Sequence, residues 1–169
     1  VTACVVRESK RLCLVDAVFC QAGEPVSRAS GLFLRPSENP AGHVWNRADV
    51  VAPPDPRIEP ESERLYFSGS EWTADVVDHV NGNRKALWHF PVPVVDGERP
   101  TPFQTAATVA DVASLAANFG TGGLEYINPD FTLALARLPT GPQVGLLATS
   151  RIEHHGITIA TVAMFDRAG

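Results

Sequence analysis

Two stretches of this chain resemble each other, and that internal similarity constrains the fold more than any single residue does. Residues 1–33 and 131–166 both read as strand, turn, strand, turn, strand, with Gly23 matching Gly156. Self-similarity at long spacing indicates a duplicated supersecondary unit. A long apolar helical segment precedes the second copy, whereas the first copy starts in the middle of a strand-like run. We therefore expect a repeated fold and a chain that is a fragment.

The composition is that of a globular protein. Hydrophobic residues make up 44% and charged residues 20% of the 169 residues, which is close to the usual globular balance. The longest apolar stretch, 109–115, contains Asp111 and is far shorter than the roughly 20 residues that cross a bilayer. The net charge is −5, and no long run of Lys or Arg occurs. We therefore expect neither a membrane span nor a nucleic-acid partner.

The three cysteines, Cys4, Cys13 and Cys20, all lie in the first copy. Their odd number and their spacing fit neither a CxxC motif nor a metal-ligand cluster. We interpret them as small apolar strand residues of a protein in a reducing cytoplasm. We expect no metal ion and no cofactor.

The chain divides into three segments of different composition. Residues 1–35 hold three apolar stretches separated by turns, which is typical of an antiparallel meander. Residues 36–64 are rich in proline, which removes ladder donors and disfavours helix at the preceding residue, so we expect an extended linker. Residues 65–169 hold further strand-like runs and one long helix. We predict the end of one repeat, a linker and a second repeat, in that order.

The long helix is predicted at 105–118, where apolar residues cover nearly the whole circumference, so it should be buried. Asn81-Gly82 marks a turn, and a long strand should follow at 84–95. Beyond the glycine-rich loop at 120–123 we expect three strands, at 130–138, 144–153 and 157–165. These elements predict an α+β fold with a curved antiparallel sheet around one helix.

The order of these motifs is similar to that of one known family. The segments TVADVASLAANFG, YINPDFTLALARLP and GITIATVAMFDRAG resemble the acyl-CoA thioesterase II-like double hot-dog family. The resemblance implies two hot-dog repeats with joined antiparallel sheets, each wrapped around a central helix, the first repeat being incomplete here. It also implies a cytoplasmic hydrolase of lipid metabolism that acts on fatty acyl-CoA thioesters. From the shared sheet of such a fold we expect a homo-oligomer, a dimer or larger.

Asp111 is the strongest catalytic candidate, because it is the only charge in a helix that we expect to be buried. A buried carboxylate is costly unless it is paired, hydrogen-bonded or functional. The structural alternative is a capping box from Thr108 to Asp111, whereas a helix that starts at Thr105 would place Asp111 in its interior. The resemblance implies that Asp111 orients or activates the water that attacks the thioester carbonyl, which is general-base chemistry.

Asn128 stands where the resembled family has a hydroxyl that helps to hold the nucleophilic water. An amide both donates and accepts hydrogen bonds, so it can fill that role. The alternative is turn chemistry at Asn128-Pro129. The third member of the family's site, a glutamine on the last strand, has no counterpart in this sequence.

Three further residues are candidate substrate contacts. Ser114 lies about one turn beyond Asp111, although a bond back to a helix carbonyl is the alternative. Gly122 lies in a loop that follows a helix, so it is not part of a phosphate cradle; it would let a ligand pass close to the backbone. Arg137 matches an Arg that the family often carries before Pro, and its guanidinium suits the phosphates of coenzyme A. The alternative for Arg137 is a solvated strand end.

Two other functions compete with hydrolysis. One is a non-catalytic hot-dog protein that binds an acyl thioester or lipid, or serves as a scaffold. The other is a hot-dog dehydratase, for which the sequence offers no Asp or Asn paired with a His. A covalent acyl-enzyme is disfavoured, because no Gly-x-Ser-x-Gly elbow occurs.

Overall fold

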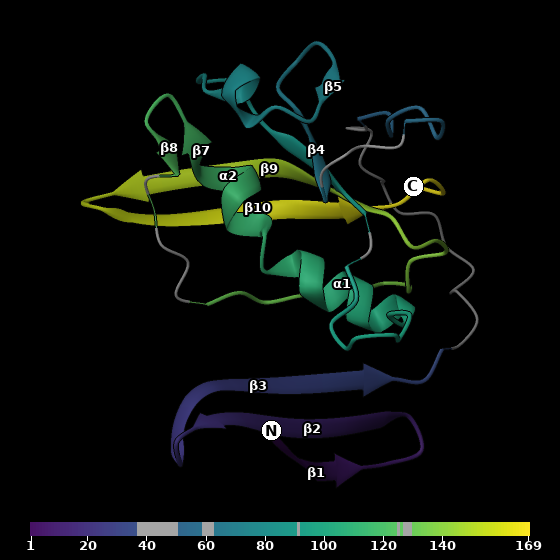
Figure 1. Cartoon of the computed structure of the whole chain (residues 1–169). Coiled ribbons are helices and arrows are strands. Elements are labelled where there is room, and N and C mark those ends of the chain that lie inside the picture. The colour runs from purple at the N-terminus through teal and green to yellow at the C-terminus, as the bar shows by residue number, and fades with distance from the viewer. Residues whose placement is uncertain (37–50, 59–62, 91, 125, 127–129) are drawn as a thin grey trace, which may run out of the picture. The chain divides into compact units, whose positions relative to one another are not determined.

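The computed structural model describes residues 1–36, 51–58, 63–90, 92–124, 126 and 130–169. The chain divides into two compact units, Val1–Arg47 and Ala48–Gly169. Each unit contains an antiparallel sheet, and the second also contains the helices (Figure 1). The described part of the chain is therefore an α+β structure, as predicted.

The first unit is an antiparallel meander, which confirms the prediction for residues 1–35. Its described strands are β1 (Thr2–Glu8), β2 (Leu12–Gln21) and β3 (Glu24–Leu34), paired in the order β1-β2-β3 (Figure 1). Ala22 and Gly23 join β2 to β3 with φ angles of 52° and 90°. Two positive φ angles in a two-residue loop are typical of a type I′ turn, which matches the twist of a hairpin. The three cysteines are free thiols.

The second unit is built on a larger antiparallel sheet, with the order β10-β9-β6-β4-β5 among the described residues. Its strands are β4 (Arg64–Phe67), β5 (Trp72–Thr73), β6 (Ala86–His89), β9 (Val144–His154) and β10 (Ile157–Phe165). A 3₁₀ helix, η1 (Val76–His79), and a small hairpin, β7 (Phe119–Gly120) with β8 (Gly123–Leu124), also belong to this unit.

The hairpin of β9 and β10 has the same turn geometry as the hairpin of β2 and β3 at the two glycines that the sequence comparison matched. His155 and Gly156 have φ angles of 49° and 80°, so they form the same kind of two-residue turn as Ala22 and Gly23. The first strand of the predicted second copy is absent, because residues 130–138 form no strand. Its sequence alternates like a strand, but a strand also needs a neighbouring edge with which to pair.

Two other sequence predictions are corrected in the second unit. The strand predicted at 84–95 is limited to Ala86–His89 within the described residues; proline offers no ladder donor beyond that point. The helix predicted at 105–118 is two helices, α1 (Pro102–Ala110) and α2 (Ala113–Asn118).

The start of α1 is fixed by a capping box at Thr101, not at Thr108. The Thr101 side chain accepts a bond from the Gln104 amide at 3.2 Å, and the Gln104 side chain accepts one from the Thr101 amide at 2.8 Å. Two otherwise unpaired backbone donors are thereby satisfied. Pro102 takes the first helical position, where its missing N–H costs nothing.

The break between α1 and α2 falls at Asp111 and Val112. The Val112 amide bonds to the Val109 carbonyl and the Leu115 amide to the Val112 carbonyl, both at 3.0 Å. These bonds span three residues rather than four, so the backbone is tighter here than in an α-helix. Asp111 is therefore exposed at a break rather than buried inside one continuous helix.

The two helices cover one face of the sheet, and aromatic side chains cover the other. The core beneath the helices contains five buried side chains: Leu87, Val109, Ala116, Val144 and Leu146. On the opposite face Trp88 is fully buried, with the rings of Trp72 and Phe165 at 6.5 and 5.7 Å. Successive side chains of β6 thus enter opposite layers, and both layers exclude water.

Gly145 on β9 allows Phe165 to lie flat against the sheet. A Cβ atom at position 145 would lie 2.3 Å from the nearest atom of the Phe165 ring. Real side chains do not approach that closely, so the Phe165 ring packs directly against the backbone of Gly145.

The buried His89 side chain should make the folded state less stable in mild acid. Burial, with a smaller contribution from the nearby Arg64 charge, lowers the pKa of His89 from 6.5 to about 4. Between pH 6.5 and pH 4 the unfolded state therefore binds a proton that the folded state does not bind. The free energy of unfolding keeps its full value above pH 6.5 and declines as pH falls towards 4. We expect a decrease on the order of 2 kcal/mol between pH 7 and pH 5.

Urea unfolding at stepped pH measures this effect. A His89→Gln variant should lose much of the slope, while retaining the part that His79 contributes, since burial lowers the pKa of His79 too. An unchanged slope in the variant would contradict the assignment to His89.

Candidate functional site

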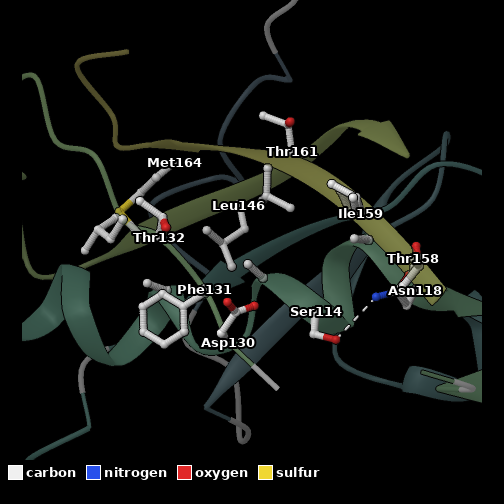
Figure 2. A pocket seen from close by; sticks show the side chains of 16 residues that line it. Ser114, Asn118, Asp130, Phe131, Thr132, Leu146, Thr158, Ile159, Thr161 and Met164 are labelled. Carbon is white, nitrogen blue, oxygen red and sulfur yellow. Dashed lines mark hydrogen bonds between the residues drawn. The ribbon is translucent and has the colours of Figure 1, made fainter. Parts of the chain in front are cut away.

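A cavity of about 440 Å³ lies in the second unit, between α2, β10 and the segment that begins at Asp130 (Figure 2). Alanines of the helices line it where they face the sheet. Its other apolar walls are formed by larger side chains, chiefly Phe131, Leu133, Leu146, Val162 and Met164. Such a cavity suits an apolar ligand whose orientation is set by a few polar groups.

A hydrogen-bond network supplies polar groups on the α2 side of this cavity. The Asn118 side chain donates to the Ser114 hydroxyl at 3.3 Å (Figure 2) and accepts from Arg151 Nε at 3.0 Å. Thr158 of β10 donates to the same Asn118 oxygen at 3.4 Å. Arg151 is held in turn by an ion pair with Glu153 at 2.6 Å. The sequence analysis missed Asn118, although its spacing of four residues from Ser114 places both on one helix face.

The ladder of β9 and β10 is irregular beside the cavity. Its register shifts by one residue between Thr161 and Val162, which leaves Thr149 unpaired in the ladder. The Thr149 hydroxyl donates to the Thr161 carbonyl at 2.9 Å. Bulges of this kind bend a strand and often occur next to functional sites.

Asp111 lies next to the cavity wall but not in it. Its neighbours Ala110 and Ala113 line the cavity, and its own carboxylate is exposed at the helix break. Within the described residues, the Asp111 carboxylate has no hydrogen-bond or ion-pair partner. A carboxylate without such a partner can accept a bond from a water molecule or a ligand.

Asp130 is the carboxylate that the structure places in the cavity wall. It points into the cavity beside Phe131 in Figure 2. The sequence pattern identified Asp130 only as the start of a strand. Asp130 could have been identified from its position directly after Asn128-Pro129, since Asn128 was predicted to hold the nucleophilic water.

Arg137 is engaged by the protein itself. Its guanidinium donates two bonds to the Asp166 carboxylate, at 2.8 and 2.7 Å, and further bonds to the carbonyls of Leu138 and Gly169. This ion pair ties the segment after Asp130 to the end of β10. A phosphate group would have to share or displace Asp166 in order to reach the guanidinium.

The remaining predicted site residues lie elsewhere. Gly122 is exposed at the turn between β7 and β8 and lines neither the 440 Å³ cavity nor the hollow described next. Asn128 lies outside the described residues. Of the predicted residues that are described, only Ser114 is in the cavity wall.

A second hollow of about 580 Å³ lies beyond the other end of α2, with Asn118 in both walls. Arg84, Lys85 and Arg151 line it together with Glu153. Lys85 is buried and donates to the carbonyls of Asn81 and Asn83 and to the Asn81 side chain. Its ammonium group is therefore committed to fixing the 81–83 turn.

The helices lie on one face of an antiparallel sheet, with a cavity of mixed apolar and polar lining between the two layers. This arrangement defines an α+β domain whose cavity can hold a ligand with both apolar and polar parts. The sequence profile of the acyl-CoA thioesterase C-terminal domain family matches residues 19–169. The chain belongs to this family. No curated protein and no solved structure matches the chain significantly.

No helix in the described part of the chain has the length and apolar character required to cross a membrane. No group of three or more His, Cys, Asp or Glu side chains in the described part is arranged to hold a metal ion.

Proposed function

We propose that the protein hydrolyses fatty acyl-CoA thioesters, with a water molecule oriented by Asp111 as the nucleophile. The water oxygen attacks the thioester carbonyl carbon while Asp111 accepts its proton. The carbon–sulfur bond then breaks, the coenzyme A thiolate leaves and is protonated, and a fatty acid is released. A thioester is already activated, so positioning and modest base catalysis are sufficient.

The observation that carries this proposal is the position of Asp111 at a helix break beside a cavity of mixed apolar and polar lining. Non-α-helical turns within helices often occur at functional sites. The cavity suits an acyl chain, and the family match indicates thioester chemistry. The Asp111 carboxylate, unpaired within the described residues, is free to hold a water molecule.

The other predicted site residues complete the proposal. Asn128 would hold the same water, and Ser114 would contact the acyl thioester. Gly122 and Arg137 would meet the coenzyme A portion, Arg137 by sharing its guanidinium between Asp166 and a phosphate. Asp130 is the competing carboxylate, since it lines the cavity directly.

We further propose a double hot-dog architecture, with residues 1–35 ending a first repeat, 36–64 as a linker and 65–169 as a second repeat. The shared type I′ turns at Gly23 and Gly156 support the duplication. The free cysteines support a cytoplasmic location. Apolar side chains of the β9–β10 hairpin, Ile152 and Ile159, are each 69% exposed, which supports association into a homo-oligomer.

Thiol release from short, medium and long acyl-CoA substrates tests the proposed function. We expect turnover on at least one chain length, and a decrease of at least about tenfold in kcat for Asp111→Asn. Asp130→Asn is the matched control, because it removes the other nearby carboxylate by the same chemical change.

The outcomes separate three cases. A large decrease of kcat in Asp130→Asn alone would identify Asp130, and not Asp111, as the general base. Turnover that neither variant changes would remove both carboxylates from the mechanism. Binding of acyl-CoA without any turnover would leave the non-catalytic acyl-thioester binding or scaffold protein as the function.

A further inference from the structure

We propose that the Ser114 hydroxyl donates a hydrogen bond to the carbonyl oxygen of the bound acyl thioester, and that Asn118 is the positioning residue that sets its direction. This inference rests on the proposed function, because it adds a contact to the same substrate. It starts from the bonds that run from Arg151 through Asn118 to Ser114.

The orientation of the Asn118 amide is dictated by Arg151. A guanidinium has only donors, so the atom that faces Arg151 Nε at 3.0 Å has to be the amide oxygen. The amide NH₂ is then directed at Ser114, 3.3 Å away. Arg151 is itself held by the Glu153 carboxylate and lies over the Tyr126 ring, 5.0 Å from its centre. The amide therefore has one favoured orientation.

That orientation leaves the Ser114 hydrogen for another acceptor. A serine hydroxyl has one hydrogen to donate, and its oxygen already accepts the bond from Asn118. The carbonyl to which a helical serine usually bonds lies four residues earlier, at Ala110, which belongs to α1 on the far side of the break. Within the described residues Ser114 donates to no acceptor, and its side chain lines the cavity.

A hydroxyl donor at this place suits the charge that develops in thioester hydrolysis. As water attacks, the carbonyl oxygen becomes an oxyanion, which a fixed donor stabilises more than it stabilises the ground state. Ser114 keeps its proton and forms no covalent bond in this role. Among the described residues, no His contacts Ser114 to activate it as a nucleophile.

Steady-state kinetics on the whole chain test the contact. Ser114→Ala should lower kcat on the order of 100-fold, with KM changed by less than about threefold. Ser114→Thr keeps the hydroxyl and should retain most of the activity. Ser70→Ala, at an exposed serine outside both hollows, is the matched control and should match the unmodified chain.

Asn118→Asp tests the positioning role separately. A carboxylate only accepts hydrogen bonds, so it would draw the Ser114 hydrogen towards itself and away from the substrate. We expect kcat to fall nearly as far as in Ser114→Ala, although the Ser114 hydroxyl is still present. Unchanged kcat in Asn118→Asp would overturn the positioning role.

Infrared spectroscopy gives a readout that a purely structural role would not change. The carbonyl stretch of a ¹³C-labelled acyl-CoA should move to lower frequency when it binds to the slow Asp111→Asn variant. Adding Ser114→Ala should return the band towards its position in water-free solvent. A carbonyl band whose frequency is the same with and without the Ser114 hydroxyl would overturn the inference.

The two readouts distinguish failure of this inference from failure of the proposed function. Turnover with no dependence of kcat or the band on Ser114 would keep the hydrolase and reject the contact. A Ser114-dependent band without turnover in any protein would keep the contact and reject hydrolysis. Failure of acyl-CoA to bind would reject both.

Discussion

Replacing Trp88 with alanine should lower the free energy of unfolding of the second unit by about 4 kcal/mol. Truncation of a buried tryptophan removes the largest fully buried side chain and leaves a cavity, which typically costs about 3–5 kcal/mol. The loss includes edge-to-face contact with Trp72 and the position of Arg167, whose guanidinium lies 4.9 Å from the Trp88 ring centre.

Urea unfolding followed by circular dichroism measures the change. Trp88→Phe is the matched control, since it keeps an aromatic ring in the layer and should cost much less. Equal losses in the two variants would show that the bond from Trp88 Nε1 to the Gln143 side chain matters more than burial.

Replacing Asp166 with alanine should cost about 3 kcal/mol, because the carboxylate is only 3% exposed and accepts several bonds. Two come from Arg137, two from the Thr140 amide and hydroxyl, and one from the Ala168 amide at 2.8 Å. Removing the carboxylate leaves the amides of Thr140 and Ala168 without this acceptor.

The same carboxylate predicts an acid limb of the stability curve. The bonds from Arg137, with those from Thr140 and Ala168, hold the pKa of Asp166 below its usual value of 3.8, although burial opposes them. The stability that they provide is present above pH 3.8 and is lost as pH falls further.

A pH series of unfolding curves separates this limb from that of His89, which lies at higher pH. Asp166→Ala should flatten the curve below pH 4. Asp55→Ala should change the curve much less, because Arg57 also lowers the pKa of Asp55 but that pair is exposed and screened by solvent. An acid limb that persists in Asp166→Ala would contradict the assignment.

Local sequence patterns predicted the elements whose signals are local. Apolar stretches and turn residues placed β9 and β10 within a few residues of their bounds and predicted the three-stranded meander of residues 1–35, and the glycine of each two-residue turn was identified. The existence of a helix near Asp111 was also predicted, from a long apolar run that would cover nearly the whole circumference of a helix.

Features that depend on distant partners could not be predicted. The break between α1 and α2 depends on backbone bonds at Val109 and Val112, and no residue there is a proline or glycine. The engagement of Arg137 by Asp166 joins residues 29 positions apart. Segment 130–138 has a strand-like pattern, yet pairing requires an edge that sequence alone does not locate.

The same distinction between local signals and distant partners applies to the residues of the candidate site. Ser114 was predicted, and it lies in the cavity wall. Asn118 was missed, because its side-chain contact is with Arg151, which reaches α2 from β9 and is 33 positions away in the sequence. Asp111 was nominated for being buried, and the structure instead exposes it at the helix break. Its catalytic role stays a prediction.

The flat contact between Phe165 and Gly145 has a consequence for the evolution of the family. Any side chain at position 145 would occupy space that the Phe165 ring already fills, so the two positions cannot change independently. Relatives with a larger residue at the first position should carry a smaller one at the second. Covariation of this pair across an alignment would therefore report which relatives keep the aromatic layer beneath the sheet.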